Sequence, residues 1–176
     1  VGTEMASETY RKKYDLKTLS DSLSIKNISK KLDIKKTYKI INDENGLKDL
    51  FSNLTRSKIF SFDTETTSID PISAQLVGAS FSFKDSEAYY IPINHDDKGT
   101  NIVLHEKSIF EYLRDLFRKK DLTVVGQNIK YDINVLHKYE IIFDCKIQDT
   151  MLMSYIYNSS GKHDLNNLAK KYLDHD

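Results

Sequence analysis

The stretch "IFSFDTETTSID", residues 59–70, places two acidic side chains, Asp63 and Glu65, directly after an apolar run. Residues two apart in a β-strand share a face, so these carboxylates should point the same way at the end of a buried strand. Open α/β sheets bind ligands at the carboxyl ends of their strands. Neighbouring carboxylates repel each other unless a cation lies between them, and hard divalent cations prefer oxygen ligands. The stretch therefore predicts a strand that ends in a metal site.

The spacing of Asp63 and Glu65 is weak evidence when taken alone. The same Asp-x-Glu pattern occurs at Asp85 and Glu87, and an arbitrary pair of this kind usually consists of solvated surface acids. The position of the first pair, immediately after an apolar strand, is what favours a functional role over the surface interpretation.

A third acid, Asp132, lies in "NIKYDINVL", residues 128–136, on the same helical stripe as Ile129, Ile133 and Leu136. A buried carboxylate is costly unless it is paired or coordinated. Asp132 could lie at the edge of the stripe and pair with a lysine or a backbone amide, or it could meet Asp63 and Glu65 as a third metal ligand. Three such carboxylates would suit a site with two metal ions about 3.5–4 Å apart, which cleaves phosphodiesters.

The composition is that of one globular domain with a short extra segment. The chain has 176 residues, 39% of them hydrophobic, and a formal net charge of zero. It contains no apolar run of about 18 residues, and its start lacks the layout of a secretory signal, so we expect no membrane segment. The single cysteine, Cys145, fits a reducing compartment.

Residues 1–36 are predicted to form a polar, lysine-rich linker, and residues 37–176 an α/β domain. Apolar runs bounded by turn residues predict strands at residues 37–41, 58–62, 75–83, 87–93 and 122–126. Helical periodicity predicts helices at residues 43–54, 106–119, 127–139, 149–158 and 163–173. Three antiparallel strands, followed by alternating helices and a strand, indicate a mixed β-sheet flanked by helices.

Several stretches also match a known family. "FDTETTSID" resembles the first exonuclease motif, and "VGQNIKYDINVL" the second, of the proofreading 3'–5' exonuclease domain in bacterial DNA polymerase I (family A). "ISAQLVGASFSF", "AYYIPINH" and "DTMLMSYIYNSSGKHDLNNLA" are similar to the same domain in the same order. The resemblance covers roughly residues 37–176 and implies the ribonuclease H-like fold of the DnaQ-like 3'–5' exonuclease superfamily.

The resemblance implies a role for nine residues. It makes Asp63, Glu65 and Asp132 catalytic ligands of two divalent metal ions, Mg²⁺ or Mn²⁺. The remaining six would contact DNA: Thr66 and Ile69 against the terminal nucleotide, Gln127, Asn128 and Tyr131 along the single-stranded 3' end, and Lys162 near the strand.

The family's third motif, Tyr-x-x-x-Asp, has no clear counterpart. Tyr172 and Asp176 have its spacing, but Tyr172 shares a helical stripe with Leu165, Leu168 and Ala169 and is predicted to be a core residue. We therefore expect the exonuclease domain to be incomplete at its C-terminal end. The polymerase and 5'-nuclease domains of the parent polymerase would be its partners, and the linker resembles the segment that follows the 5'-nuclease domain.

The resemblance implies a monomeric, metal-dependent enzyme that removes nucleotides from single-stranded DNA 3' ends as a proofreader in DNA replication and repair. Such an enzyme would work in the cytoplasm, associated with the nucleoid. Two alternatives stay open: a catalytically silent scaffold or DNA-binding fragment, and a ribonuclease D-type exonuclease acting on RNA 3' ends.

Overall fold

The computed structural model describes residues 36–93 and 106–173. The predicted linker, apart from Lys36, lies outside the described residues, and so does Asp176. The chain divides into two compact units, and the described residues up to Asn167 all belong to one of them. Residues 168–173 belong to the other unit.

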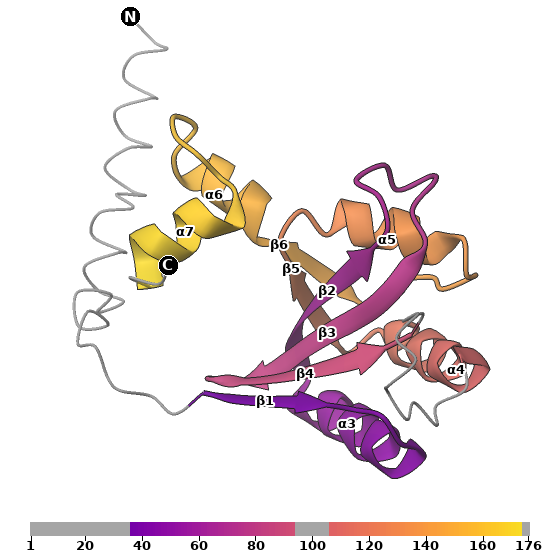
Figure 1. Ribbon diagram of the computed structural model, residues 1–176. Coiled ribbons are helices and arrows are strands. Elements are labelled where there is room, and N and C mark those ends of the chain that lie inside the picture. Colours follow the sequence, from indigo (N-terminus) through magenta and orange to yellow (C-terminus); the bar gives the residue numbers. More distant parts are fainter. Residues whose placement is uncertain (1–35, 94–105, 174–176) are drawn as a thin grey trace, which may run out of the picture. The chain divides into compact units, whose positions relative to one another are not determined.

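Six strands form one mixed sheet in the order β1-β4-β3-β2-β5-β6 (Figure 1). They are β1 (Thr37–Ile40), β2 (Ile59–Thr66), β3 (Leu76–Lys84), β4 (Glu87–Pro92), β5 (Thr123–Gly126) and β6 (Lys146–Asp149). Strands β2, β3 and β4 are antiparallel neighbours, whereas β1 runs parallel to β4, and β5 and β6 run parallel to β2. The predicted mixed sheet is confirmed, with β2 in its interior.

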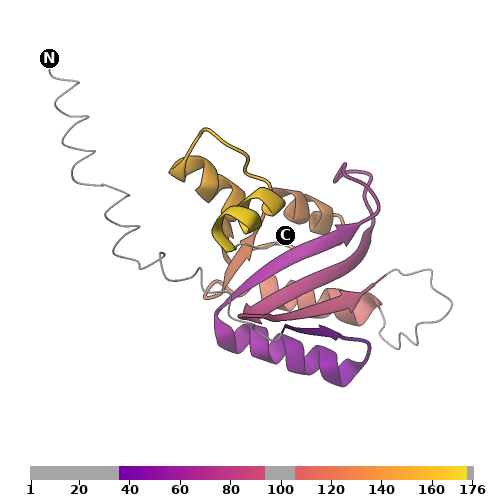
Figure 2. The same cartoon turned by 60° about the vertical axis from the view of Figure 1, so that its left-hand side comes forward.

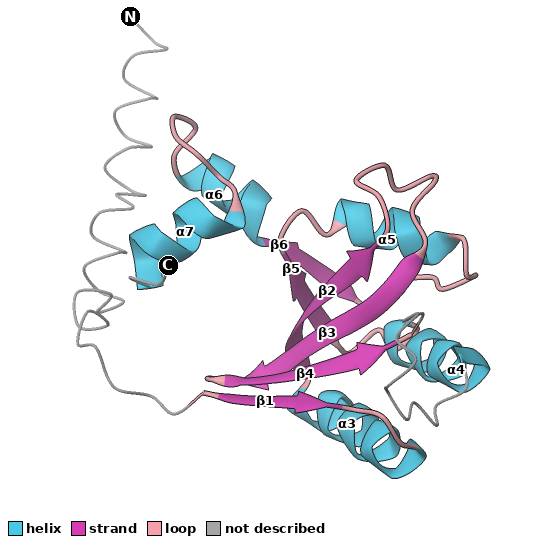
Figure 3. Cartoon of the chain, in the orientation of Figure 1, coloured by secondary structure: helices cyan, strands magenta, loops and turns pink. Residues whose placement is uncertain are grey.

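The described residues form five helices, each where periodicity predicts one (Figure 3). They are α3 (Glu44–Ser57), α4 (Glu106–Phe117), α5 (Lys130–His137), α6 (Thr150–Tyr157) and α7 (Leu165–Leu173). Helix α3 begins where the sequence indicates, because the Asp43 carboxylate accepts a hydrogen bond of 2.8 Å from the Gly46 N–H. This is the usual N-cap bond, which satisfies one of the free donors of the first turn.

The strands differ from prediction in two places. Strand β2 extends to Thr66, four residues beyond the predicted end, so Asp63 and Glu65 lie within the strand rather than after it. Strand β6 was not predicted. Its sequence, "KIQD", has no apolar alternation, and its first three residues are exposed, but pairing with β5 makes it the last strand of the sheet.

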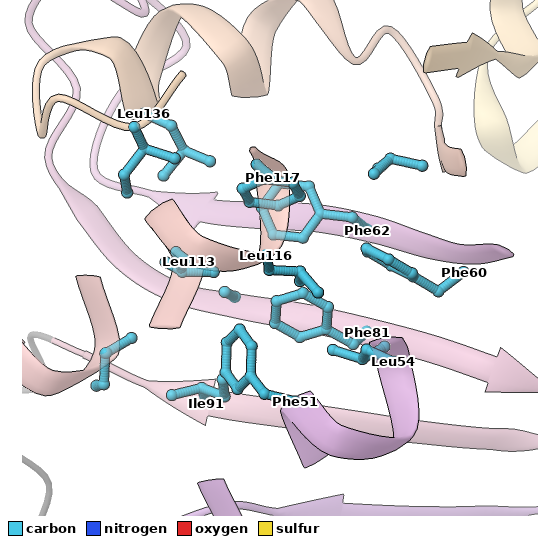
Figure 4. Close-up of a cluster of buried hydrophobic side chains, with 14 of the residues drawn as sticks. Phe51, Leu54, Phe60, Phe62, Phe81, Ile91, Leu113, Leu116, Phe117 and Leu136 are labelled. Atoms are coloured by element: carbon cyan, nitrogen blue, oxygen red, sulfur yellow. The ribbon is translucent and has the colours of Figure 1, made fainter. Parts of the chain in front are cut away.

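The core lies between one face of the sheet and helices α3, α4 and α5. Phe60 and Phe62 of β2 and Phe81 of β3 point to this face and are almost fully buried (Figure 4). The Phe62 ring meets the Phe117 ring of α4 edge-on at 5.0 Å between centroids, and the Phe81 ring meets Phe51 of α3 at 5.9 Å. Truncating a phenylalanine buried in this way costs about 3–5 kcal/mol. This packing holds β2 firmly against the helix layer.

The other face of β2 is exposed. Ile59, Ser61, Asp63 and Glu65 alternate with the buried residues along the strand, and Figure 2 shows β2 and β3 side by side. The strand therefore carries core residues on one face and both carboxylates on the other, as the two-residue period of a strand requires.

The predicted core stripe on α7 is wrong. No residue of this helix is buried, and Tyr172 is 44% exposed. Periodicity shows that a helix has an apolar face, but it does not show that other residues cover that face. Helix α6 also has no buried residue.

Among the described residues, no helix combines the length and apolar content needed to cross a bilayer.

Candidate active site

Strand β2 presents Asp63 and Glu65 side by side on its exposed face. Asp63 pairs with Ser80 of β3 and Glu65 with Gly78, and the pairing register shifts between Glu65 and Thr66. Small residues thus lie opposite both acids. The register shift ends regular pairing directly after the second carboxylate.

Asp132 reaches the same strand from helix α5. Its side chain is 2% exposed, and its Oδ1 atom accepts two hydrogen bonds, one of 2.9 Å from the Thr64 N–H and one of 2.6 Å from Thr64 Oγ1. The sequence left open whether Asp132 would pair with a backbone amide or face the other acids. It does pair with an amide, and because both bonds go to Oδ1, they leave Oδ2 as the oxygen for any further ligand.

Asp132 and Glu65 lie close enough to Asp63 to affect its ionisation. Although Asp63 lies on the exposed face of β2, its pKa is raised from 3.8 to about 6, first because surrounding atoms partly shield the carboxylate from water and then by the charges of Asp132 and Glu65. Burial is also the main reason why the pKa of Asp132 is raised, although its bonds from Thr64 act in the opposite direction. A carboxylate whose charged form is disfavoured by its surroundings and by neighbouring acids is one that a bound cation would stabilise.

The donor set is made of oxygen atoms only, which suits Mg²⁺ or Mn²⁺ better than a metal that prefers nitrogen or sulfur. Within residues 36–93 and 106–173, however, no group of three histidine, cysteine or acidic side chains is already arranged to hold a metal ion. Asp63, Glu65 and Asp132 are therefore neighbours with suitable chemistry, and their side chains would have to adjust to share an ion.

A pocket of about 440 Å³ lies at the end of β2, lined by Thr66, Thr67, Ser68, Ile69 and Tyr131. The Tyr131 hydroxyl is 2.5 Å from Thr66 Oγ1 and donates to the carbonyl oxygen of Ser68. Ile69 is 97% exposed at the pocket. Three of the six residues predicted to contact DNA are therefore brought together here.

The other three predicted DNA contacts lie elsewhere. The Gln127 amide is engaged within the protein, because its Nε2 donates to the His163 carbonyl oxygen at 2.7 Å and its Oε1 accepts from Thr150 Oγ1 at 2.5 Å. Asn128 has a left-handed φ of 56°, and its N–H donates to Asp149 Oδ1 at 3.0 Å. Lys162 is exposed in the loop before α7, and within the described residues it forms no hydrogen bond with the other five predicted DNA contacts.

Two residues of the site were missed by sequence reasoning. Thr64 carried no signal, since a threonine between two acids in a strand has several ordinary explanations. Asp149 carried a recognisable one, an aspartate directly before an apolar helix. Its Oδ1 accepts from the Met151 N–H at 2.9 Å and so caps α6, and its charge is among the causes that raise the pKa of Asp132.

A family model described as 3'–5' exonuclease matches residues 38–176. The chain belongs to this 3'–5' exonuclease family. Among curated relatives of the exonuclease, DNA polymerase I of Pseudomonas aeruginosa is 39% identical over 141 residues, and DNA polymerase I of Borreliella burgdorferi is 36% identical over 138 residues. Each match covers 78% of this chain and 15% of the polymerase, so the chain spans about 15% of the length of these relatives.

Solved structures show the fold of the exonuclease. The Aedes aegypti Nibbler EXO domain aligns with a TM-score of 0.63 at 14% identity, over 82% of this chain and 72% of that one. Escherichia coli RNase D aligns with a TM-score of 0.60 at 13% identity, over 79% of this chain and 34% of that one. Brucella melitensis NrnC with bound Mg²⁺ aligns with a TM-score of 0.54 at 18% identity, over 81% of this chain and 64% of that one. The predicted ribonuclease H-like fold of DnaQ-like exonucleases is confirmed, and family membership identifies the domain as a nuclease and a hydrolase.

Proposed function

We propose that this domain hydrolyses the terminal phosphodiester of single-stranded DNA 3' ends, with two divalent metal ions held by Asp63, Glu65 and Asp132. The observation that carries the proposal is the proximity of the three carboxylates: after shielding from water, the charges of Asp132 and Glu65 are the next causes that raise the pKa of Asp63 to about 6. Acids on an exposed strand face would ordinarily stay apart and ionise freely. Their proximity supports a site that holds divalent cations.

Mg²⁺ or Mn²⁺ ions bound there would make a bound water nucleophilic and neutralise charge on the leaving oxygen. The chain's own residues prepare the site. Thr64 fixes Oδ1 of Asp132, so that Oδ2 can serve as a ligand. Asp63 holds a proton up to about pH 6 when no cation is near and would release it on cation binding.

The pocket beside the carboxylates supports a role in holding the terminal nucleotide. Ile69 offers an exposed apolar side chain against which a base can stack, while Thr66 and Tyr131 offer hydroxyl groups. Contacts of this kind do not read the base, so selection for a mismatched end would come from fraying, since a mispaired terminus is single-stranded more often. Gln127, Asn128 and Lys162 would extend the DNA contact along the strand, Gln127 and Asn128 mainly through the loops that they hold.

The context that we propose is a DNA polymerase I chain, because both relatives described above carry that name. The exonuclease would act as a monomer beside the polymerase and 5'-nuclease domains of that chain. As part of a bacterial replication and repair enzyme, it would work in the cytoplasm at the nucleoid.

The test is release of label from 3'-labelled single-stranded DNA in the presence of Mn²⁺. We expect the unsubstituted chain to release label and Asp63→Ala to release none. Asp85→Ala is the matched control, because Asp85 belongs to the other Asp-x-Glu pair, in the turn between β3 and β4, and should leave release unchanged. Equal loss in both variants would contradict the assignment of Asp63.

Two further arms separate the alternatives. An RNA strand of the same sequence differs only in its 2'-hydroxyl groups, so faster release from RNA would favour a ribonuclease D-type activity. Calorimetric titration with Mn²⁺ counts the ions. No label release and no Mn²⁺ binding by the unsubstituted chain would favour the silent scaffold, whereas two bound ions would support the proposed mechanism.

A further inference from the structure

Glu65, Gly78 and Tyr90 lie on the same face of the sheet, one on each of three neighbouring strands. Glu65 of β2 pairs with Gly78 of β3, whose partner on β4 is Pro92, and Tyr90 of β4 lies diagonally to Gly78 because it pairs with Ser80, two residues along the same face. Gly78 therefore lies between the strand of Tyr90 and the strand of Glu65 (Figure 1). Because residue 78 is a glycine, the middle strand has no side chain at this position.

The Tyr90 phenol occupies the space above Gly78. A Cβ atom added at Gly78 would lie 2.0 Å from Tyr90 Oη and 2.3 Å from Tyr90 Cζ. Real Cβ atoms do not approach other atoms so closely, so any other residue at position 78 would displace the hydroxyl end of the ring. The glycine is thus required by the tyrosine, and not by a turn or a special backbone angle.

The position of the hydroxyl brings it toward Glu65. Neighbouring strands lie about 4.8 Å apart, and the phenol has already crossed from β4 to the space above β3. The next side chain in that direction is Glu65 on β2. Burial is the first cause and the Glu65 charge the second of a raised pKa at Tyr90, which agrees with a carboxylate near the phenol.

We propose that Tyr90 is a positioning residue that holds the Glu65 carboxylate for metal binding, with its hydroxyl in the gap that Gly78 leaves between the two strands. The inference deepens the proposed function and rests on it, because Glu65 acts here as a metal ligand. Tyr90 itself touches neither substrate nor metal. A partner that orients a metal ligand typically changes metal affinity by about tenfold or more when it is removed.

Tyr89 provides a matched control on the same strand. It points to the opposite face, and its hydroxyl donates to Glu87 Oε2 at 2.8 Å, a glutamate outside the proposed site. Tyr89→Phe and Tyr90→Phe each remove one hydroxyl that lies near a glutamate. Only the second should change the proposed metal site.

The experiment is calorimetric Mn²⁺ titration of the unsubstituted chain and of Tyr90→Phe, Tyr89→Phe, Gly78→Ala and the Gly78→Ala/Tyr90→Phe double variant, each with its melting temperature. We expect Tyr90→Phe to weaken Mn²⁺ binding about tenfold, with a melting temperature no lower than that of Tyr89→Phe. Gly78→Ala should weaken binding similarly, because the methyl group displaces the phenol. The double variant should bind no worse than Gly78→Ala alone, since both changes remove the same interaction.

Binding by Tyr90→Phe within about twofold of the unsubstituted chain would overturn the inference, whatever Gly78→Ala does. Asp63→Ala, run in parallel, separates this failure from failure of the proposed function. If Asp63→Ala abolishes binding while Tyr90→Phe does not affect it, only the role of Tyr90 is lost. If the unsubstituted chain binds no Mn²⁺, the metal site is lost and the role of Tyr90 with it.

Discussion

Thr64 and Asp132 are 68 positions apart in the sequence, yet Thr64 donates two hydrogen bonds to a single carboxylate oxygen of Asp132. One comes from the backbone N–H and the other from the side-chain hydroxyl. The pair joins the central strand β2 to helix α5 between Asp63 and Glu65 in the strand. It satisfies a buried charge, which would otherwise be costly, and fixes the direction of its second oxygen.

Replacing Thr64 by valine keeps the shape of the side chain and removes one donor to the buried Asp132. We expect a loss of about 1–3 kcal/mol in the free energy of unfolding, measured by urea denaturation at pH 7. Thr64→Ser is the matched control, because it keeps the hydroxyl and loses only a methyl group, and it should stay closer to the unsubstituted chain. A valine variant as stable as the serine variant would argue against the importance of the hydroxyl bond.

The raised pKa of Asp63 predicts a dependence of stability on pH. Because the folded chain holds this proton more tightly than the unfolded chain, ionisation of Asp63 destabilises the fold as pH rises from about 4 to about 6. Asp63→Asn removes the charge, so in the metal-free chain it should raise the melting temperature at pH 7 and change it little at pH 4. Equal effects at both pH values would mean that Asp63 ionises normally.

Asp70 should behave in the opposite way and serves as a control for the pH experiment. Hydrogen bonds from Ser73 and from the Ile72 N–H hold the pKa of this exposed carboxyl below its usual value. The stabilisation is present above the unfolded pKa and is lost as pH falls through the folded one. Asp70→Asn should therefore lower the melting temperature at pH 7 more than at pH 3.

The two hydrogen bonds of the Gln127 amide predict that this residue acts through loop structure. Gln127→Ala removes the links to Thr150 and to the His163 carbonyl group, so amide hydrogen exchange should become faster in residues 158–164. Gln127→Glu keeps the acceptor for Thr150 and loses the donor to His163, which should give an intermediate effect. Weaker DNA binding with unchanged exchange would instead indicate a direct contact with the strand.

Asp149 is predicted to be important for stability because its Oδ1 accepts from α6 and from Asn128. Asp149→Ala should cost about 1–2 kcal/mol for the cap alone, and more because the Asn128 N–H also loses its partner. Asp164→Ala is a suitable comparison, since this exposed aspartate accepts from the Asn167 N–H at the start of α7 without a second loop to hold. Urea denaturation should give a smaller loss for Asp164→Ala.

Most of the fold could be predicted from the sequence because its elements carry strong local patterns. The five described helices have apolar stripes, and strands β2 to β5 are apolar runs between turn residues. Strand β6 has neither pattern, since its place in the sheet depends on pairing with β5 rather than on its side chains. The exposed face of α7 could not be predicted either, because burial depends on what other residues cover a helix.

The acids of the candidate site could be proposed from the sequence, whereas their supporting contacts could not. Asp63, Glu65 and Asp132 stand out because charged residues are unusual beside apolar runs. The contact of Thr64 depends on the packing of α5 against β2. The role that we propose for Tyr90 depends on the space that Gly78 leaves for its hydroxyl group. Contacts between residues far apart in sequence leave no local pattern to read.

Buried and exposed residues alternate strictly along β2. The strand should therefore tolerate substitutions at its exposed positions better than a change in its number of residues. Inserting or deleting one residue between Phe60 and Asp63 would put the two parts of the strand out of phase, so that either the acids turn toward the core or Phe60 turns toward water. Conservative substitutions at single positions affect only one face at a time. Variants that survive in a library with both kinds of change should therefore retain the number of residues in β2 while varying its exposed positions Ile59 and Ser61.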